Sequence, residues 1–204
     1  MHANTREGTA GQRAAWLFHV GAYPIPVGQV LRPYGLACEQ QALLRQCERA
    51  LVDGTDAIEH LLEGVRRDVP STPGRYRPEM VLLEAIFERV RRHVQPEAPS
   101  RLEVVFAWST RSVAERFCAE YCPGAVIHRC VLVAGMSVER DGALVVAAFD
   151  AFEQPGLLAG RLRRVEERAE QYWRAEGPMV FPEVLVRGII RVEAIDGEGD
   201  QSPT

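Results

Sequence analysis

A histidine closes the first strongly apolar stretch of the sequence. The run "AWLFHVG" carries apolar residues up to His19, and Gly21 follows two positions later. Histidine changes charge near physiological pH and can donate or accept a hydrogen bond at a bound group. His19 is therefore a candidate binding residue, although a single strand-end histidine more often hydrogen-bonds within a core.

Two other polar groups stand where apolar strands end or begin. The stretch "FAWST" carries Phe106, Trp108 and Ser109 just before a predicted helix, and Glu183 opens the apolar run "PEVLVRGIIRV". A carboxylate that leads a buried strand is costly unless it is paired or lies at the mouth of a site. The simpler interpretation is that both rings face a core and that Glu183 pairs with an arginine.

Four residues offer a candidate zinc site. Cys118, Cys122, His128 and Cys130 form the pattern C-x3-C-x5-H-x-C, with the first pair on one helix face and the second pair on one strand face. Structural zinc usually uses tighter C-x2-C pairs. We therefore expect no metal here, and we interpret the cysteines as reduced thiols on a helix and a neighbouring strand.

The elements that position these residues predict an α+β fold with a small, mainly antiparallel sheet. Apolar spacing and turn residues predict strands and helices in turn, with Ser109, Thr110 or Ser112 as the cap of the fourth helix. The predicted strands are 14–20, 101–108, 125–135 and 182–195, and the predicted helices are 33–54, 55–68, 78–94, 109–122, a short one after Asp141, and 156–177.

Composition narrows the class of protein. The chain has 204 residues and a net charge of −4, and all 24 basic residues are arginine, which argues against a general nucleic-acid binder and excludes a lysine nucleophile. No apolar run reaches the ~18 residues of a membrane span.

We expect flexible tails at 1–13 and 196–204 around a single domain, 14–195. The N-terminal residues lack a signal core, so we expect a cytoplasmic protein.

The order of these motifs resembles the ADP-ribosyltransferase superfamily. "FHVGAYPIPVGQVLRP" is similar to its "FHG…G-x-x-L-x-P" element, "FAWSTRSVA" to "YFTAT-x-x-A-A", and "EVLVRGIIRV" to "E-x-L-x-x-G-x-V". The most similar members are small bacterial ones with His-Tyr-Glu or His-Tyr-Asp triads, such as the rifampicin-modifying type. "P-S-R" at 99–101 and "A-x-x-Y-W" at 169–173 also resemble an uncharacterised bacterial family. The resemblance implies a split antiparallel sheet core with helical insertions, and it leaves the helices within 36–94 unexplained.

The resemblance also implies roles for the candidate residues. NAD would be the substrate: His19 would hold a ribose hydroxyl, Gly21 would let the backbone approach the nicotinamide carboxamide, and Glu183 would stabilise the oxocarbenium-like centre. Phe106 or Trp108 would stack on the nicotinamide ring beside Ser109, and Arg32 or Arg101 would contact the pyrophosphate. Its catalytic set would be Glu183, His19 and Phe106. These residues would then line one cleft.

Two departures from the family pattern matter. The family tyrosine falls on Phe106, which keeps the ring and loses the hydroxyl. Phe181 stands where the arginine-modifying members carry a glutamate, which argues against arginine as the acceptor. The acceptor, whether protein, nucleic acid or small molecule, stays open.

Several functions therefore stay open. The first is a mono-ADP-ribosyltransferase acting as a toxin, a defence effector or a small-molecule modifier, and a toxin would imply an antitoxin or immunity partner. The second is an NAD glycohydrolase or an RNA phosphotransferase on the same fold. The third is a non-catalytic nucleotide-binding or interaction module, for which the missing tyrosine hydroxyl is the sign. A zinc-supported scaffold is the last.

Overall fold

The computed structural model describes residues 6–7, 16–33, 38–68 and 78–195. The chain divides into two compact units, each assembled from segments that are distant in sequence. The sheet unit comprises 1–34, 103–141 and 179–204, and the helical unit comprises 35–102 and 142–178. The helical insertion expected at 36–94 is thus one part of a larger helical unit.

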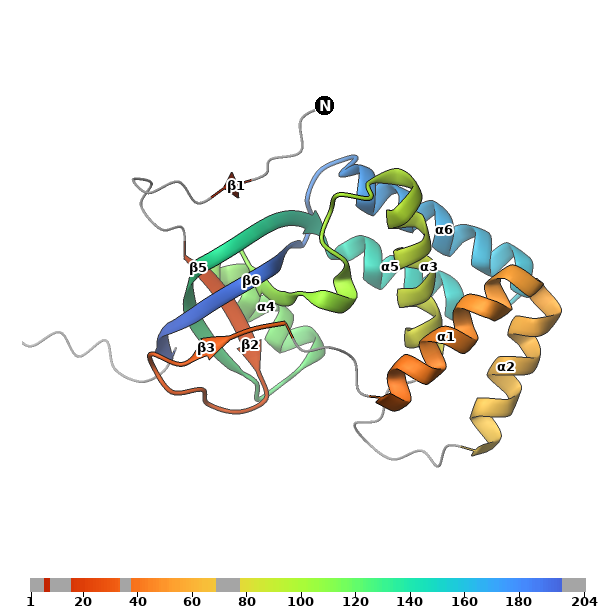
Figure 1. Ribbon diagram of the computed structural model, residues 1–204, viewed down its shortest axis with the longest axis horizontal. Helices are drawn as coiled ribbons and strands as arrows, with labels where there is room; N and C mark the ends of the chain where they lie inside the picture. The colour runs from red at the N-terminus through yellow and green to blue at the C-terminus, as the bar shows by residue number, and fades with distance from the viewer. Residues whose placement is uncertain (1–5, 8–15, 34–37, 69–77, 196–204) are drawn as a thin grey trace, which may run out of the picture. The chain divides into compact units, whose positions relative to one another are not determined.

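The sheet unit is built on one antiparallel sheet in the order β1-β5-β2-β4-β6-β3 (Figure 1). β5 pairs with β2 on one side and with β6 on the other, so four of the strands close on themselves. The strands are β1 (Arg6–Glu7), β2 (Leu17–Gly21), β3 (Val30–Leu31), β4 (Val105–Trp108), β5 (Val126–Asp141) and β6 (Pro182–Ile195).

The face of the sheet that turns inward carries the apolar core of this unit. Side chains two positions apart share a strand face, and those of directly paired residues share it too. The buried core cluster follows this rule: Leu17, Leu31, Val105, Ala107, Cys130, Val184, Val186, Ile190 and Val192. The outer face near β4 is covered by helix α4 (Arg111–Tyr121), whose first turn is capped by the Thr110 side chain.

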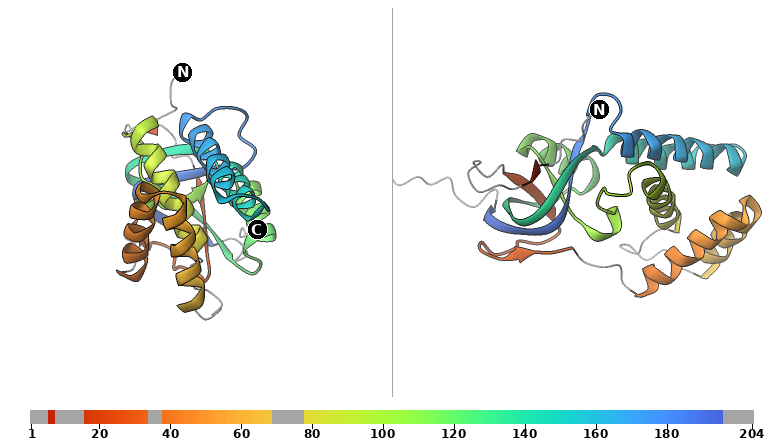
Figure 2. Two further views of the ribbon diagram at one scale, coloured as in Figure 1. Left: turned by 90° about the vertical axis from the view of Figure 1, so that its right-hand side faces the viewer. Right: turned by 45° about the horizontal axis from the view of Figure 1, so that its top comes forward.

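β5 and β6 are long, curved strands that lie against each other along most of their length (Figure 2). Gly135 and Gly188 are paired where the two backbones come closest. A Cβ at Gly188 would lie 2.1 Å from the Ala134 carbonyl oxygen, and one at Gly135 would lie 2.3 Å from that of Arg187. The predicted strand 125–135 is therefore too short, because Gly135 allows the strand to continue instead of ending it.

The helical unit contains the helices α1, α2, α3, α5 and α6. Their bounds are Cys38–Asp53, Thr55–Asp68, Pro78–Val94, Ala143–Glu153 and Leu158–Arg174. Phe87, Tyr172 and Trp173 are almost fully buried between α3 and α6, and the Trp173 indole N–H donates to the Phe87 carbonyl at 2.7 Å. Tyr172 and Trp173 are therefore core residues of the helical unit.

The helix predictions agree with the structure, and two further strand-level predictions need correction. Residues 101–103 form a 3-10 turn, and the strand begins only at Val105. Within the expected tail 1–13, Arg6 and Glu7 form β1 and pair with Ser137 and Met136. The rest of that tail, the tail 196–204 and residues 69–77 lie outside the described residues.

Candidate functional site

His19 lies on β2, the strand between β5 and β4. Its Nδ1 is 2.9 Å from the Phe106 carbonyl oxygen on β4. A carbonyl only accepts, so Nδ1 carries the proton and Nε2 carries a lone pair. Burial lowers the pKa of His19, the Phe106 carbonyl opposes that shift, and His128 adds to it. His19 is therefore neutral at pH 7, with Nε2 as an acceptor that makes no hydrogen bond among the described residues.

His128 on β5 is paired directly with His19 and is fully buried. The two imidazole centroids are 6.1 Å apart. The Ile25 backbone N–H donates to Nε2 of His128 at 2.9 Å, and Nδ1 lies 3.4 Å from the His19 carbonyl oxygen. This tautomer is thus the same as that of His19. The sequence placed His128 only in a candidate zinc pattern, and no sequence signal pairs it with His19.

Glu183 begins a row of paired residues that crosses four strands. It lies opposite Arg140 on β5 and Trp108 on β4, and Trp108 in turn lies opposite Phe18 on β2. Glu183, Arg140 and Trp108 are all at least nine-tenths buried. The Trp108 ring packs on Phe117 of α4 with centroids 4.3 Å apart, which confirms the core interpretation of this ring. Arg140 was not anticipated from the sequence.

The pairing register of the strands places His19 and Glu183 on opposite faces of the sheet, whereas the resemblance places both in one cleft. Phe18, Trp108 and Glu183 point to one face of the sheet, because directly opposed residues share a face. His19 follows Phe18 in the same strand, so it points to the other face, with Leu17 and Cys130 as strand-face neighbours. The expectation of a shared cleft for His19, Trp108 and Glu183 is therefore wrong at the level of the strand register.

The three residues of the expected catalytic set nevertheless lie on neighbouring strands. β2, β4 and β6 are consecutive neighbours, so His19, Phe106 and Glu183 lie on three adjacent strands. Phe106 is half-buried and shares the face of Trp108, and its backbone carbonyl is the partner of His19. Ser109 follows β4 and is half-buried. Arg32 directly follows β3 and is exposed.

The proposed role of Gly21 needs revision. A Cβ at this position would lie 3.3 Å from Cε1 of His128 and 3.5 Å from Cδ1 of Ile25. The space above Gly21 on that side is thus filled by the chain itself. The missing side chain makes room for His128 and the following loop.

Arg101 is held by contacts within the helical unit. It is in the helical unit, nine-tenths buried, and it forms an ion pair with Glu84 at 3.1 Å. Its Nη1 donates to the Tyr172 hydroxyl at 2.8 Å, and its guanidinium lies over the Phe87 and Tyr172 rings. These contacts use the guanidinium N–H groups that would have to bind a pyrophosphate, so Arg101 is a structural residue.

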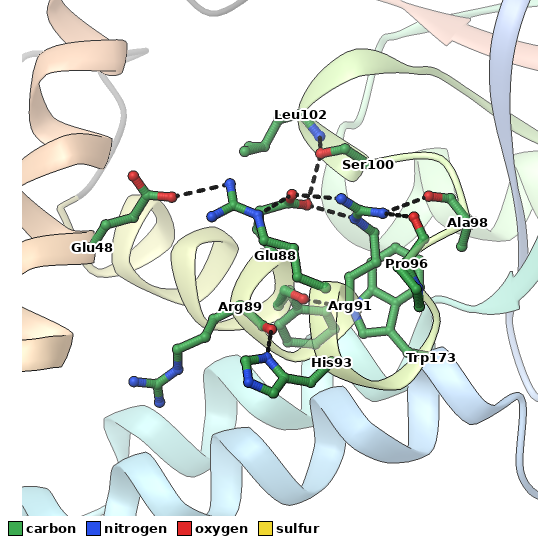
Figure 3. Close-up of polar contacts among 12 residues, drawn as sticks. Glu48, Glu88, Arg89, Arg91, His93, Pro96, Ala98, Ser100, Leu102 and Trp173 are labelled. Carbon is green, nitrogen blue, oxygen red and sulfur yellow. Dashed lines mark hydrogen bonds and ion pairs between the residues drawn. The ribbon is translucent and has the colours of Figure 1, made fainter.

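Ser100 belongs to a second buried network of the helical unit (Figure 3). Its hydroxyl donates to Glu88 at 2.8 Å, and Arg91 and Arg92 donate to the same carboxylate at 2.8 to 3.0 Å. Arg91 also donates to the carbonyls of Pro96 and Ala98. Burial alone would raise the pKa of Glu88, but the hydrogen bonds from Arg91, Ser100 and Arg92 hold it below its usual value. The network fixes the chain that runs from α3 towards β4.

The pKa values of the cysteines in the candidate zinc pattern are all raised. Within the described part of the chain, no three His, Cys, Asp or Glu side chains are placed to hold a metal ion. Burial raises the pKa of Cys118 to about 11 and that of Cys130 to about 12, so both are protonated thiols at neutral pH.

No helix in the described ranges is long and apolar enough to cross a membrane.

Comparison with known proteins gives a family but no activity. Residues 51–197 match the family described as "Protein of unknown function (DUF2441)". This match covers more than half of the chain, which therefore belongs to that family. No curated protein matches the chain. Function must therefore be argued from the site itself.

Proposed function

We propose that the sheet unit binds a nicotinamide adenine dinucleotide or a related nucleotide at His19, without the catalytic arrangement of an ADP-ribosyltransferase. The observation that carries this proposal is the state of His19. Its Nδ1–H is held by the Phe106 carbonyl, so the ring orientation and the tautomer are fixed before a ligand arrives. The remaining Nε2 lone pair suits a ribose hydroxyl, which is a hydrogen-bond donor.

Two further residues bear on the choice of ligand. Phe106 serves His19 through its backbone carbonyl, because its ring shares the face of Trp108 and therefore points away from His19. Arg32 is exposed after β3, and a guanidinium suits phosphate geometry. Glu183 is buried beside Arg140 and Trp108 on the other face of the sheet, which argues against a direct role on the same ligand.

A second candidate is the transferase itself, because β2, β4 and β6, the strands that carry His19, Phe106 and Glu183, are neighbours in the sheet. It requires Glu183 to reach the ligand held by His19. Only this candidate predicts cleavage of the nicotinamide bond, since a carboxylate at the oxocarbenium-like centre acts in the transition state.

Calorimetry with NAD and a kinetic assay of free nicotinamide separate the candidates. We expect the wild type to bind NAD, His19→Ala to bind at least tenfold more weakly, and Glu183→Gln to bind as the wild type does. Nicotinamide release should stay at the rate of the buffer blank. Release above the blank that falls 10²–10³-fold in Glu183→Gln would instead support the second candidate, and labelled ADP-ribose found on an acceptor would separate a transferase from a glycohydrolase. No NAD binding by the wild type would refute both candidates.

A further inference from the structure

We propose that His128 is an acid-sensitive latch for the loop 22–29, which joins β2 to β3. This inference is independent of nucleotide binding. It concerns how one buried side chain fixes an exposed segment that follows directly on the strand of His19. The loop carries Tyr23 and Val27, which are 79% and 61% exposed.

The latch is the hydrogen bond from the Ile25 backbone N–H to Nε2 of His128. Ile25 stands between Pro24 and Pro26, and proline has no N–H. Ile25 therefore supplies the backbone donor in the middle of the turn, and a buried donor without an acceptor is costly. The Ile25 side chain packs on the core cluster of the sheet unit, so the same residue anchors the loop twice.

The other end of the loop is held by different contacts. The Gly28 N–H donates to the Val192 carbonyl at 2.8 Å, and the Val192 N–H donates to the Gln29 carbonyl at 2.9 Å. These are backbone bonds to β6, and they do not titrate. Loss of the His128 contact would therefore free the middle of the loop while its β3 end stays attached.

The latch requires His128 to be neutral. A protonated imidazole has N–H groups on both nitrogens, so Nε2 would face the Ile25 N–H as a second donor. When the loop is released, Nε2 of His128 can take a proton. When the loop is latched, the Ile25 N–H occupies the lone pair of Nε2 and no proton binds there. Since the latched state binds fewer protons, acidification must shift the equilibrium towards release.

The titratable groups that the described residues bring near His128 leave this sign unchanged. His19 faces it from β2, and protonation of that ring would oppose a second positive charge. Cys130 lies two positions along β5 and is a protonated thiol. Glu193 on β6 is an acidic group that acts on Cys130, and Arg129 points to the opposite face of β5. Tyr23 is the titratable side chain of the loop itself.

Amide hydrogen exchange at Ile25, measured by NMR and corrected for the intrinsic pH dependence, tests the latch. Between pH 7.5 and pH 5 we expect the Ile25 protection factor to fall at least tenfold, while Val192 keeps its protection. His128→Gln places a non-titrating acceptor near the position of Nε2 and should make Ile25 protection independent of pH. His19→Gln is the matched control and should retain the wild-type fall.

The imidazole resonances of the wild type give a second measurement that needs no variant. His128 protonation and the loss of Ile25 protection should share one midpoint. Unchanged Ile25 protection over this pH range would overturn the proposal. So would a midpoint that follows His19 instead of His128, or the same fall in His128→Gln as in the wild type.

Discussion

Arg101 and Glu84 show how burial changes the value of an ion pair. Their side chains are 8% and 17% exposed, and Arg101 also holds the Tyr172 hydroxyl. Glu84→Gln would leave a buried guanidinium without its counter-charge, and we expect a loss of about 3–5 kcal/mol in the free energy of unfolding. Urea denaturation measures this loss.

The matched control for this substitution is Glu167→Gln. Glu167 pairs with Arg163 on α6, but the two side chains are 58% and 82% exposed. Water and salt screen such a pair, so the expected loss is below about 1 kcal/mol. Equal losses in the two variants would show that Arg101 is solvated in solution.

The lowered pKa of Glu88 predicts how the free energy of unfolding depends on pH. Its pKa in the folded protein lies below 4.5, the value for an unperturbed glutamate, so the folded state holds this proton more weakly than the unfolded state. The stabilisation is therefore complete above the unfolded pKa and is lost as the pH falls through the folded pKa. Glu88→Gln should be less stable than the wild type at pH 7.

The difference between Glu88→Gln and the wild type should shrink below about pH 4. Denaturant midpoints measured from pH 7 to pH 3 give this difference directly. A gap that stays constant over this range would mean that the Glu88 charge contributes nothing to the network.

At the scale of the elements, the crossing of β5 and β6 depends on two glycines. A Cβ on Gly188 would lie 2.1 Å from the Ala134 carbonyl oxygen and 2.8 Å from Cα of Gly135, and both neighbours are backbone. Gly188→Ala must therefore shift the strands apart, and we expect a loss of more than about 3 kcal/mol in unfolding free energy, since overpacking a rigid site is costly.

Gly64 supplies the control of opposite sign. It lies within α2, and no atom comes within 4 Å of a Cβ built there. Gly64→Ala should raise the free energy of unfolding by about 0.5–1 kcal/mol, because alanine loses less backbone entropy in a helix. Thermal unfolding of both variants tests the pair, and a neutral Gly188→Ala would contradict the close approach.

The same glycines show what sequence could and could not predict. The helices could be predicted because their apolar spacing and their terminal residues are encoded by neighbouring positions in the sequence. Examples are Pro78 at the start of α3 and Thr110 before α4. Gly135 looked like a strand end, since its reason is a partner 53 positions away. His19 and Glu183 were identified as unusual, but their faces depend on the register with β4, which no local pattern encodes.

Arg101 is the clearest case of a non-local outcome. An arginine beside an expected strand suits phosphate, yet Glu84 and Tyr172 come from two helices that fold around it. The helical unit draws on both 35–102 and 142–178, and the sequence pattern suggested only the first of these as an insertion. His128 was missed as a partner of His19 because their contact depends on pairing between β2 and β5.

At the scale of the whole molecule, each unit has its own buried core, although the chain passes between them at four points. The sheet unit is centred on Leu17, Ala107 and Ile190, and the helical unit on Phe87, Tyr172 and Trp173. Regions with separate cores open with separate free energies, which amide exchange resolves residue by residue. Glu84→Gln weakens only contacts inside the helical unit, and Gly188→Ala only contacts inside the sheet unit.

Native-state hydrogen exchange on these two variants should therefore give opposite patterns. In Glu84→Gln we expect amides of α3 and α6 to lose protection by at least 10²-fold, while the β5–β6 ladder keeps nearly all of its own. In Gly188→Ala the ladder should lose protection and the helices should keep it. The ratio between the two regions is the measured quantity, since a uniform loss reports only global unfolding. If both variants lowered protection equally in the two units, the molecule would unfold as one cooperative body, and the division into two cores would have no energetic meaning.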